Sequence, residues 1–416
     1  MHNICSCHHY ANYLYVTMSL NIFLDSLQES DFESIKDSCS FKKAIEINWN
    51  SFPDWGGAHI AIIGVPEERG TKTNEGTAQA ADVIRQKLYK LKRGTGAYKI
   101  VDLGNLRLGE TLEDTHSRLR EVCAMLLEHN VFPIVLGGSH DLCFGQYMGY
   151  QVLGRRMSIV NIDAFIDMEE FEGESFSQHH LYKILTHSDT HLLDYIHLGY
   201  QTYLADRHTL EALEKLHFEA RRLGVAREDI IKNEPLIRDA DMMTIDVSAI
   251  RMADAPGCAQ SQPFGFSGEE ACQLCWYAGQ SNKLTSLGIY EYNPSLDMRG
   301  QTAGIIATMI WYFIEGFYNR QPDFEMNKPS TFYRYLVQID SAPNHLTFYK
   351  CTRTDKWWMG VPYNLSDTQE EQLYLLPCSY SEYLEATHGD LPLRWIITHA
   401  KLQLNGLTPP NWDKNS

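Results

Sequence analysis

Long apolar runs and an excess of basic residues are both missing from this chain of 416 residues. A membrane-spanning helix needs about 20 consecutive apolar residues, and no stretch of the sequence approaches that length. Lysine and arginine together number 36, whereas aspartate and glutamate number 53, so the net charge is −17. Such a charge is repelled by nucleic-acid phosphates and by anionic membrane surfaces. We therefore expect neither a nucleic acid nor a membrane as a partner.

The cysteines also lack the dense spacing of a disulfide framework. Ten cysteines are scattered over the chain, mostly among apolar residues. Disulfide frameworks are typical of short secreted chains that cannot build a sufficient core. Apolar residues make up 44% of this chain, which is enough for a sizeable core. The pattern predicts a reducing, cytoplasmic compartment.

The first residues lack the features of a secretory signal. The stretch "MHNICSCHHYANYLYVT" has no basic segment followed by a clean apolar core. It does contain possible metal ligands, namely Cys5, Cys7, His8 and His9. No second ligand pair follows at zinc-finger spacing, so we interpret residues 1–17 as a disordered leader.

Apolar runs alternate with amphipathic stretches from about residue 58 to residue 320. Strands are predicted in "YKIVDLGNL", "SIVNIDAFID" and "DMMTIDVSAI", and helices in "LEDTHSRLREVCAMLLEHN" and "TAGIIATMIWYFIEGFYN". Two further predictions are a helical segment over residues 18–55 and a helix in "ALEKLHFEARRLG", residues 212–224. Strands that alternate with helices indicate an α/β fold with a mostly parallel sheet covered on both faces.

The composition changes after about residue 322. The stretch from 331 to 363 predicts a β-hairpin or meander, and "YSEYLEATHG" and "PLRWIITHAKLQLNG" predict two helices. We therefore expect an α/β domain over 18–322 and an aromatic-rich α+β module over 323–416. The segment "KWWMGVPY" places several large side chains together: Trp357, Trp358, Met359 and Tyr363. Such density is typical of a core or an interface, so we expect packing against the α/β domain, with a subunit contact or a ligand site as alternatives.

Polar groups stand at four predicted strand ends, in "GGSHD", "DAFID", "IDVSAIRMADAPG" and "YEYNPSLD". Sites in open α/β sheets form at the carboxyl ends of the strands. One histidine and three aspartates from three strands could converge there on a hard divalent cation: His140, Asp163, Asp167 and Asp246. Each motif alone is more often a turn or a capped strand end than a metal site.

Taken together and in this order, the motifs resemble those of the ureohydrolase superfamily, which includes arginase, agmatinase and formimidoylglutamase. That family has G-G-D-H-S, D-A-H-x-D, S-x-D-x-D-x-x-D-P, E-x-N-P-x-x-D and then a helix beginning T-A. This chain has "GGSHD", "DAFID", "TIDVSAIRMADAPG", "EYNPSLD" and "QTAGIIA". The resemblance covers roughly residues 58–320 and, with the C-terminal module, is closest to formimidoylglutamase-like arginase relatives of Bacteroidota. It implies a three-layer α/β/α sandwich.

The resemblance implies a binuclear manganese site of which only one half is present. One ion would be held by His140, Asp163, Asp167 and Asp246. The second ion would share two of these aspartates and would also need a histidine where Phe165 stands and an aspartate where Ser248 stands. An aryl ring cannot ligate, and a serine hydroxyl replaces a carboxylate poorly. We therefore expect at most one divalent metal, manganese, or none.

Losing the second ion removes much of the implied chemistry, because two ions together activate a hydroxide and clamp the tetrahedral intermediate. Single-zinc deacetylases of this fold use the metal position whose histidine is lost here. The order Ser139-His140-Asp141 also changes the groups that orient the histidine. We predict a catalytically weak or inactive protein that acts in ligand binding, regulation or scaffolding. The alternative is a single-metal hydrolase of the C–N bond in a linear amidine or guanidine, with a formimidoylglutamate-like or arginine-like substrate.

Some residues on the substrate side match the family. Glu291 stands where a family glutamate pairs with a guanidinium or amidine, and a plain loop acid is the alternative. His180 or His179 matches a substrate-loop histidine, and the spacing does not decide between them or exclude a solvated loop histidine. Arg251 could supply the charge of the missing ion, or it could form an ordinary salt bridge with Asp254. We expect a small amidine- or guanidine-like ligand and a homo-oligomer or protein partner.

Overall fold

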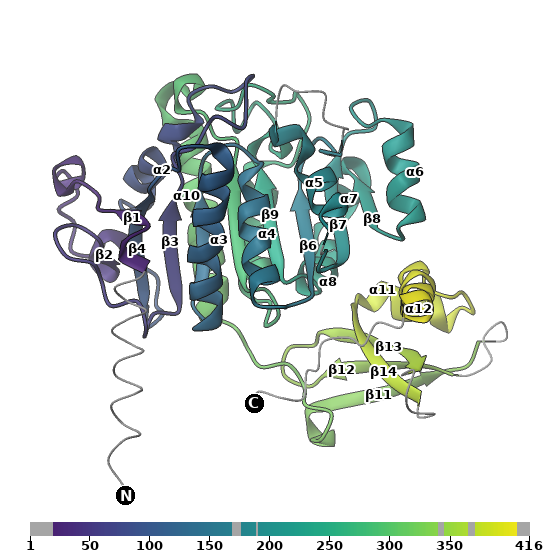
Figure 1. The fold of residues 1–416 in the computed structure, drawn as a ribbon. Helices are drawn as coiled ribbons and strands as arrows, with labels where there is room; N and C mark the ends of the chain where they lie inside the picture. Colours follow the sequence, from purple (N-terminus) through teal and green to yellow (C-terminus); the bar gives the residue numbers. More distant parts are fainter. Residues whose placement is uncertain (1–19, 169–175, 189, 340–344, 365–370, 406–416) are drawn as a thin grey trace, which may run out of the picture.

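The computed structural model describes residues 20–168, 176–188, 190–339, 345–364 and 371–405. The expected leader, residues 1–17, lies outside the described residues. The chain forms one ten-stranded sheet and a separate four-stranded sheet (Figure 1). Across the described ranges, no helix is both long enough and apolar enough to cross a membrane.

The large sheet is almost entirely parallel, with strand order β1-β4-β3-β5-β10-β9-β6-β7-β8 and with β2 beside β4. Only β1 pairs antiparallel, with β4. The strands are β1 Leu24–Asp25, β2 Glu46–Ile47, β3 Ile60–Gly64, β4 Ile100–Leu106, β5 Phe132–Leu136, β6 Met157–Ile162, β7 Leu192–Tyr200, β8 Glu219–Arg222, β9 Met242–Asp246 and β10 Ser286–Tyr290. Every residue of β3, β5, β6, β9 and β10 is buried, as expected for parallel strands covered on both faces.

Helices cover both faces of this sheet, which confirms the three-layer α/β fold. One face packs under α2 Ala80–Leu88, α8 Glu234–Arg238, α9 Gly268–Gly279 and α10 Gln301–Tyr318. The other packs under α3 Leu112–Glu128, α4 Leu142–Val152, α5 His180–Thr186 and α6 Arg207–Lys215. Figure 1 shows α3 and α4 in front of the sheet and α10 behind it. Each face has its own apolar cluster, so the sheet separates two cores.

The predicted helical segment over residues 18–55 is wrong for its described part. The chain there forms β1, β2 and two short 3-10 helices, Glu29–Phe32 and Phe41–Ala44. Phe32 and Phe41 are buried against the α2 side of the sheet. Edge pairing with β4 satisfies backbone groups that a helix would have bonded internally.

The predicted helix over residues 212–224 is also wrong in its second half. Helix α6 ends at Lys215, and the chain then turns through His217, whose φ is 58°. Residues Glu219–Arg222 pair with β7 as the edge strand β8, and α7 Leu223–Glu228 follows. The helical spacing of apolar residues continues past the turn, but the free edge of β7 offers hydrogen bonds that override it.

The C-terminal residues form a second, antiparallel sheet, as the meander prediction required. Its strands are β11 Phe332–Val337, β12 Leu346–Cys351, β13 Trp357–Asn364 and β14 Glu371–Cys378, paired in chain order. Two helices follow, α11 Tyr380–Thr387 and α12 Leu393–Asn405. Phe348, Met359 and Val361 are fully buried in a cluster of this module alone. The domain boundary at residues 322 and 323 stays a prediction.

The module contacts the large sheet through α8. The Arg238 guanidinium lies 4.2 Å from the centre of the Trp358 ring. Its Nη2 also donates to the backbone oxygen of Trp357 at 3.1 Å and of Cys378 at 3.4 Å. Trp358 therefore meets the α/β domain, while Trp357 packs inside the module.

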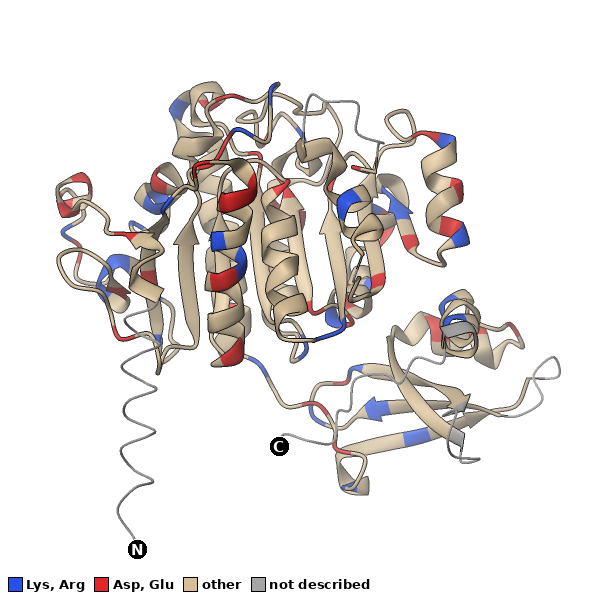
Figure 2. Ribbon diagram, in the orientation of Figure 1, with Lys and Arg blue, Asp and Glu red and all other residues tan. Residues whose placement is uncertain are grey.

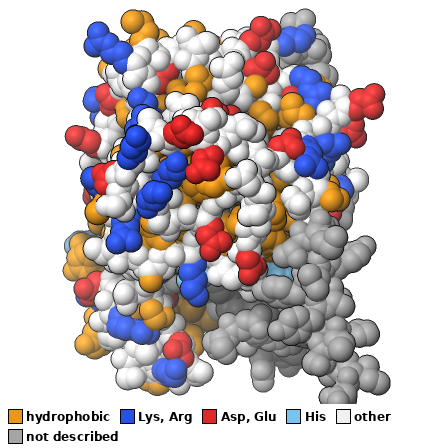
Figure 3. Space-filling view, turned by 90° about the vertical axis from the view of Figure 1, so that its left-hand side faces the viewer, with side chains coloured by type: hydrophobic (Ala, Val, Ile, Leu, Met, Phe, Trp, Pro, Cys, Tyr) orange, Lys and Arg blue, Asp and Glu red, His pale blue; other side chains and the backbone are white. Residues whose placement is uncertain are grey.

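Charges of both signs are interspersed along the elements. On α3, for example, acidic and basic residues alternate along the visible side (Figure 2). The face at the β1 edge shows hydrophobic side chains between separate charged groups of both signs (Figure 3).

Candidate metal centre

The predicted ligands come together because their strands are neighbours. The sheet order places β5, β10, β9 and β6 side by side, and all four run parallel. His140 follows β5, Asp163 follows β6 directly, and Asp246 is the last residue of β9. Their side chains thus start from the same edge of the sheet, where the carboxyl ends of parallel strands meet.

A tight glycine turn places His140 at this edge. Gly137 and Gly138 have φ values of 87° and 78°, in the left-handed region that glycine adopts without strain. A Cβ atom at Gly138 would lie 2.6 Å from the carbonyl oxygen of Glu67. The chain can therefore enter α4 immediately after β5, with His140 just before its first turn.

Three carboxylates surround one nitrogen of His140. Its Nδ1 lies 3.1 Å from Asp246 Oδ2, 3.3 Å from Asp163 Oδ2 and 3.6 Å from Asp167 Oδ2. These four side chains are between 1% and 9% exposed. Their ligand atoms lie within 4.8 Å of one another, a spacing that a metal ion could bridge. The structure thus brings the four predicted residues together, while their role as ligands stays a prediction.

Without a cation this cluster holds protons. Burial and the neighbouring Asp246 carboxylate raise the pKa of Asp163. Burial and Asp163 raise the pKa of Asp167 well above its ordinary value. Burial alone would lower the pKa of His140, but its interactions with Asp163 and Asp246 outweigh burial and raise it well above its ordinary value. A bound cation would displace these protons, so its affinity should increase with pH.

The outer carboxylate oxygens are already bonded to the protein. Asp163 Oδ1 accepts hydrogen bonds from the Phe165 backbone N–H at 3.0 Å and from the Ser248 hydroxyl at 3.1 Å. Asp246 Oδ1 accepts from the Ser248 N–H at 2.7 Å. The inner oxygen Asp163 Oδ2 is buried and has no hydrogen-bond partner among the described residues. Phe165 and Ser248 therefore donate hydrogen bonds to the Oδ1 atoms of Asp163 and Asp246, on the side away from His140.

Glu291 lies at the same edge, but both of its oxygens are engaged. It follows β10 with a φ of 63°, which is unusual for a residue with a side chain. Its Oε1 accepts from the His140 backbone N–H at 2.9 Å, and its Oε2 accepts from Asn74 Nδ2 at 2.8 Å. Burial and Asp246 raise its pKa to about 8. Asn74 was not predicted, since nothing in "KTNEG" marks it as facing Glu291.

Of the two histidines in the substrate-loop segment, His180 reaches the cluster. Its ring centre lies 4.1 Å from that of His140. Its Nδ1 lies 3.0 Å from the Ser177 carbonyl oxygen and 3.3 Å from Asp167 Oδ2. Burial and the charge on His140 lower the pKa of His180 well below its ordinary value, so its ring is neutral.

Cys143 is a second residue that the sequence analysis did not single out. It lies in the first turn of α4, three residues after His140, and is buried. Its thiol and the rings of His140 and His180 form a group whose ligand atoms lie within 4.8 Å of one another. Burial and the nearby Asp141 raise the pKa of Cys143 well above its ordinary value, so the thiol is protonated in the metal-free chain. The sequence signal that could have pointed to Cys143 is the spacing H-x-x-C, from His140 to Cys143, at the start of a helix.

Ser139 and Asp141 flank His140 in the reverse of the family order D-H-S, and they are hydrogen-bonded to each other. The Ser139 hydroxyl donates to Asp141 Oδ1 at 2.5 Å, and His116 on α3 lies 2.6 Å from Asp141 Oδ2. Although burial opposes it, the His116 hydrogen bond keeps the pKa of Asp141 below its ordinary value. Asp141 therefore anchors the start of α4 to α3.

Arg251 forms a salt bridge with Asp254 at a partly exposed position. Its Nε lies 2.8 Å from Asp254 Oδ2, and its side chain is 41% exposed. Both residues line a cavity of about 780 Å³ beside α9 and α10, together with groups such as Trp276 and Tyr312. None of the four clustered residues lines this cavity, so the arrangement agrees with the surface salt bridge.

Comparison with known proteins agrees with the fold and the motifs. A model of the arginase family matches residues 58–315. Formimidoylglutamases from Streptococcus pyogenes serotypes M3 and M5 are 26% identical over 299 residues, which cover 65% of this chain and 88% of theirs.

Solved structures with the same fold include a formiminoglutamase and a formimidoylglutamase. Formiminoglutamase from Trypanosoma cruzi, solved with Mn²⁺, has a TM-score of 0.59 and 21% identity, and the match covers 64% of this chain and 95% of that one. Formimidoylglutamase from Bacillus subtilis has a TM-score of 0.59 and 20% identity, with 72% and 96% covered. At this identity the structures establish the fold alone.

Proposed function

The chain belongs to the arginase family, and on that premise we propose that it is a catalytically weak or inactive member. It would hold at most one hard divalent cation and would act by binding a small amidine- or guanidine-like ligand, in regulation or as a scaffold. One observation carries this proposal: the outer oxygens of Asp163 and Asp246 are capped by hydrogen bonds from Phe165 and Ser248.

The inner half of the centre suits one hard cation. Three carboxylate oxygens and one imidazole nitrogen would hold it: Asp163, Asp167, Asp246 and His140. Oxygen-rich donor sets of this kind suit manganese or magnesium rather than soft metals. Asp163 Oδ2 supports this fit, because it is buried, accepts no hydrogen bond from the described residues and lies 3.3 Å from His140 Nδ1. A cation there would lower the pKa of a bound water.

The outer half does not suit a second ion. Neither Phe165 nor Ser248 provides the nitrogen or carboxylate that the family has there, and the Ser248 hydroxyl points its proton at Asp163. An ion at that place would have to displace two backbone hydrogen bonds and one hydroxyl hydrogen bond. Each such bond contributes about 1 kcal/mol, and more when the acceptor is charged.

The substrate side is also partly occupied by the protein itself. A guanidinium or amidine binds a carboxylate best through two parallel N–H···O bonds. In this chain the Asn74 amide and the His140 N–H hold one Glu291 oxygen each. A ligand would have to displace Asn74 to engage Glu291 fully, which favours weak binding over efficient turnover.

The second candidate is a single-metal hydrolase of a linear amidine. It is favoured by the placement of His180 and Glu291, which both lie at the cluster where such a substrate would bind. The matched formimidoylglutamases support a formimidoylglutamate-like substrate for this alternative.

Elemental analysis and an activity assay on one preparation separate these candidates. We expect one manganese or fewer per chain after loading and dialysis, with no release of formamide, ammonia or urea from formimidoylglutamate or arginine. The matched variant Asp246→Asn should lose the manganese. Two tightly held manganese ions per chain, or turnover that disappears in Asp246→Asn, would overturn the proposal.

We also propose a cellular compartment and an assembly state for the protein. All eight described cysteines are free thiols, which supports a reducing, cytoplasmic compartment. We also propose a homo-oligomer or a protein partner for the intact chain. Light scattering of the purified protein would test this, and a monomer at all concentrations without a co-purifying protein would contradict it.

A further inference from the structure

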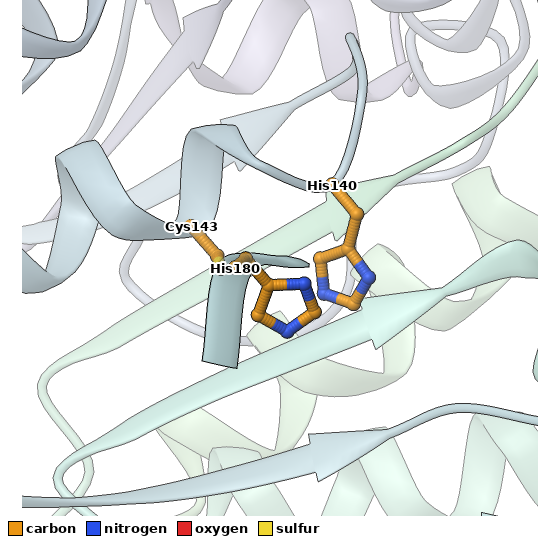
Figure 4. A group of neighbouring side chains, drawn as sticks. All are labelled: His140, Cys143 and His180. Atoms are coloured by element: carbon orange, nitrogen blue, oxygen red, sulfur yellow. The ribbon is translucent and has the colours of Figure 1, made fainter. Parts of the chain in front are cut away.

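A second group of possible metal ligands lies next to the carboxylate cluster and has softer donors. It consists of His140 after β5, Cys143 in the first turn of α4 and His180 at the start of α5 (Figure 4). All three are buried, with 0%, 2% and 3% of their surfaces exposed. Two helix starts, packed against each other, thus bring a thiol and two imidazoles together.

The His140 ring offers its second nitrogen to this group. Its Nδ1 faces the three carboxylates, whereas its Nε2 is buried and has no hydrogen-bond partner among the described residues. Figure 4 shows the His140 ring reaching toward His180. A buried ring nitrogen without a hydrogen-bond partner is unfavourable, so such an atom marks a place where a ligand is expected.

The surroundings of both rings match those of metal-bound histidines. Metal-binding imidazoles usually donate their other N–H to a carboxylate or a backbone carbonyl, which fixes the tautomer and the ring orientation. His140 has Asp246 Oδ2 at 3.1 Å from Nδ1. His180 has the Ser177 carbonyl at 3.0 Å and Asp167 Oδ2 at 3.3 Å. These contacts orient the two rings before any ion binds.

We propose that His140, Cys143 and His180 form a site for a soft divalent cation, with zinc as the best match, on the Nε2 side of the His140 ring. Thiolate and imidazole are the donors that zinc prefers in proteins, whereas manganese prefers oxygen. The site therefore differs from the carboxylate cluster in its donors, although both use His140. Three protein ligands leave one position of a tetrahedral zinc ion for water or another small ligand.

Binding is balanced by the loss of two protons, one from the thiol and one from Nε2 of the charged His140 ring. The Cys143 S–H bond and the His140 Nε2–H bond break, the sulfur and the nitrogen each form a bond to the cation with the electron pair left behind, and both protons pass to solvent. No oxidant or reductant takes part. Because the cation replaces the thiol proton, binding should strengthen as the pH increases.

Cobalt substitution of the full chain tests the thiolate directly. Co²⁺ bound to a thiolate has a charge-transfer absorption in the near ultraviolet, which oxygen and nitrogen ligands do not produce. We expect this band on titration of the chelator-treated protein, and we expect zinc to abolish it by displacement. In Cys143→Ser the band should be lost while the circular dichroism of the fold remains.

Cys258→Ser is the matched control. Cys258 is also a buried thiol near the carboxylates, since Asp246 and Glu291 help to raise its pKa, but it is outside the proposed ligand group. Its replacement should leave the cobalt band in place. A wild-type protein without the band, a band that survives in Cys143→Ser, or a band that disappears in Cys258→Ser would each overturn the proposal.

One further measurement keeps the test independent of variant folding. X-ray absorption of the zinc-loaded wild-type chain should contain one sulfur neighbour at about 2.3 Å, and a first shell of oxygen and nitrogen only would overturn the proposal.

Discussion

At the scale of single residues, Asp163 shows how the centre is divided. Its Oδ2 faces His140, whereas its Oδ1 is bonded to Phe165 and Ser248. One carboxylate thus has an open side and a closed side. The groups that close the Oδ1 side belong to Phe165 and Ser248, the two residues that stand where the family has metal ligands.

Restoring those two ligands tests whether the positions converge. In the double variant Phe165→His and Ser248→Asp, the new aspartate adds a fourth carboxylate to a buried acidic cluster. Phe165 is half buried, so its loss should cost only about 1 kcal/mol. The buried carboxylate should cost about 3 kcal/mol or more without a cation. We expect a lower melting temperature than wild type in chelator and selective recovery with manganese.

Calorimetric melting in chelator, manganese and magnesium measures this effect. The single variant Phe165→His is the matched control, since it adds no charge and should respond less to manganese. A double variant whose melting temperature ignores manganese would show that positions 165 and 248 do not face one ion.

Asn74 is the residue that separates Glu291 from a ligand. In Asn74→Ala, Glu291 Oε2 loses its 2.8 Å hydrogen bond and gains space beside it. We expect a loss of about 1–2 kcal/mol in the free energy of unfolding. We also expect guanidinium compounds such as arginine to bind at least about tenfold tighter, because one charge-assisted bond becomes free to form.

Isothermal titration with arginine checks this prediction. Asn319→Ala is the control, because Asn319 bonds the Glu315 carbonyl at the end of α10, far from the cluster in sequence and fold. Unchanged or weaker arginine binding in Asn74→Ala would show that Glu291 is not a ligand-binding group.

At the scale of elements, α8 joins the large sheet to the C-terminal module. Arg238 is almost fully buried and connects to β13 and β14 through backbone oxygens and the Trp358 ring. The Nζ of Lys283 contacts Asp239 and Asp241, and the Tyr374 hydroxyl donates to Asp239 at 3.1 Å. The contact is thus polar and buried, so each partner depends on the other.

Arg238→Ala should uncouple the two parts. The variant loses hydrogen bonds from a charged group and the cation–π contact, which together contribute about 2–4 kcal/mol. Arg207→Ala on α6 is the control, because Arg207 is 88% exposed and its pair with Glu211 lies on the surface. Urea unfolding followed by tryptophan fluorescence should show a lower midpoint for Arg238→Ala only. Equal midpoints in the two variants would contradict a stabilising role for this contact.

At the scale of the whole molecule, the C-terminal module has its own apolar cluster, and it also contacts the α/β part through hydrogen bonds from Arg238. A chain that ends at residue 325 would leave Arg238 and Asp239 without their partners in the module. We expect this shortened chain to melt several degrees lower and to bind a hydrophobic dye. If it stays folded, equally stable and in the same assembly state, the module is an independent appendage.

The sequence by itself determined the fold class and the four clustered residues. Buried strands were readable from continuous apolar runs, and in a parallel sheet every strand ends at the same edge. His140, Asp163, Asp167 and Asp246 follow or end such strands, so their convergence follows from topology once the strands are known. The absence of ligands at Phe165 and Ser248 could also be read from the sequence, because it depends only on which residues stand at these two positions.

Only the tertiary structure decided which atoms face each other across separate segments. Asn74 reaches Glu291 over 217 positions of chain, and His180 rather than His179 meets His140, because loop paths depend on packing that no local pattern encodes. The edge strand β8 formed where helical spacing continued, because β7 offered unpaired backbone groups. The capping of Asp163 Oδ1 and the free Nε2 of His140 depend on ångström-scale geometry, which a strand-end motif leaves open.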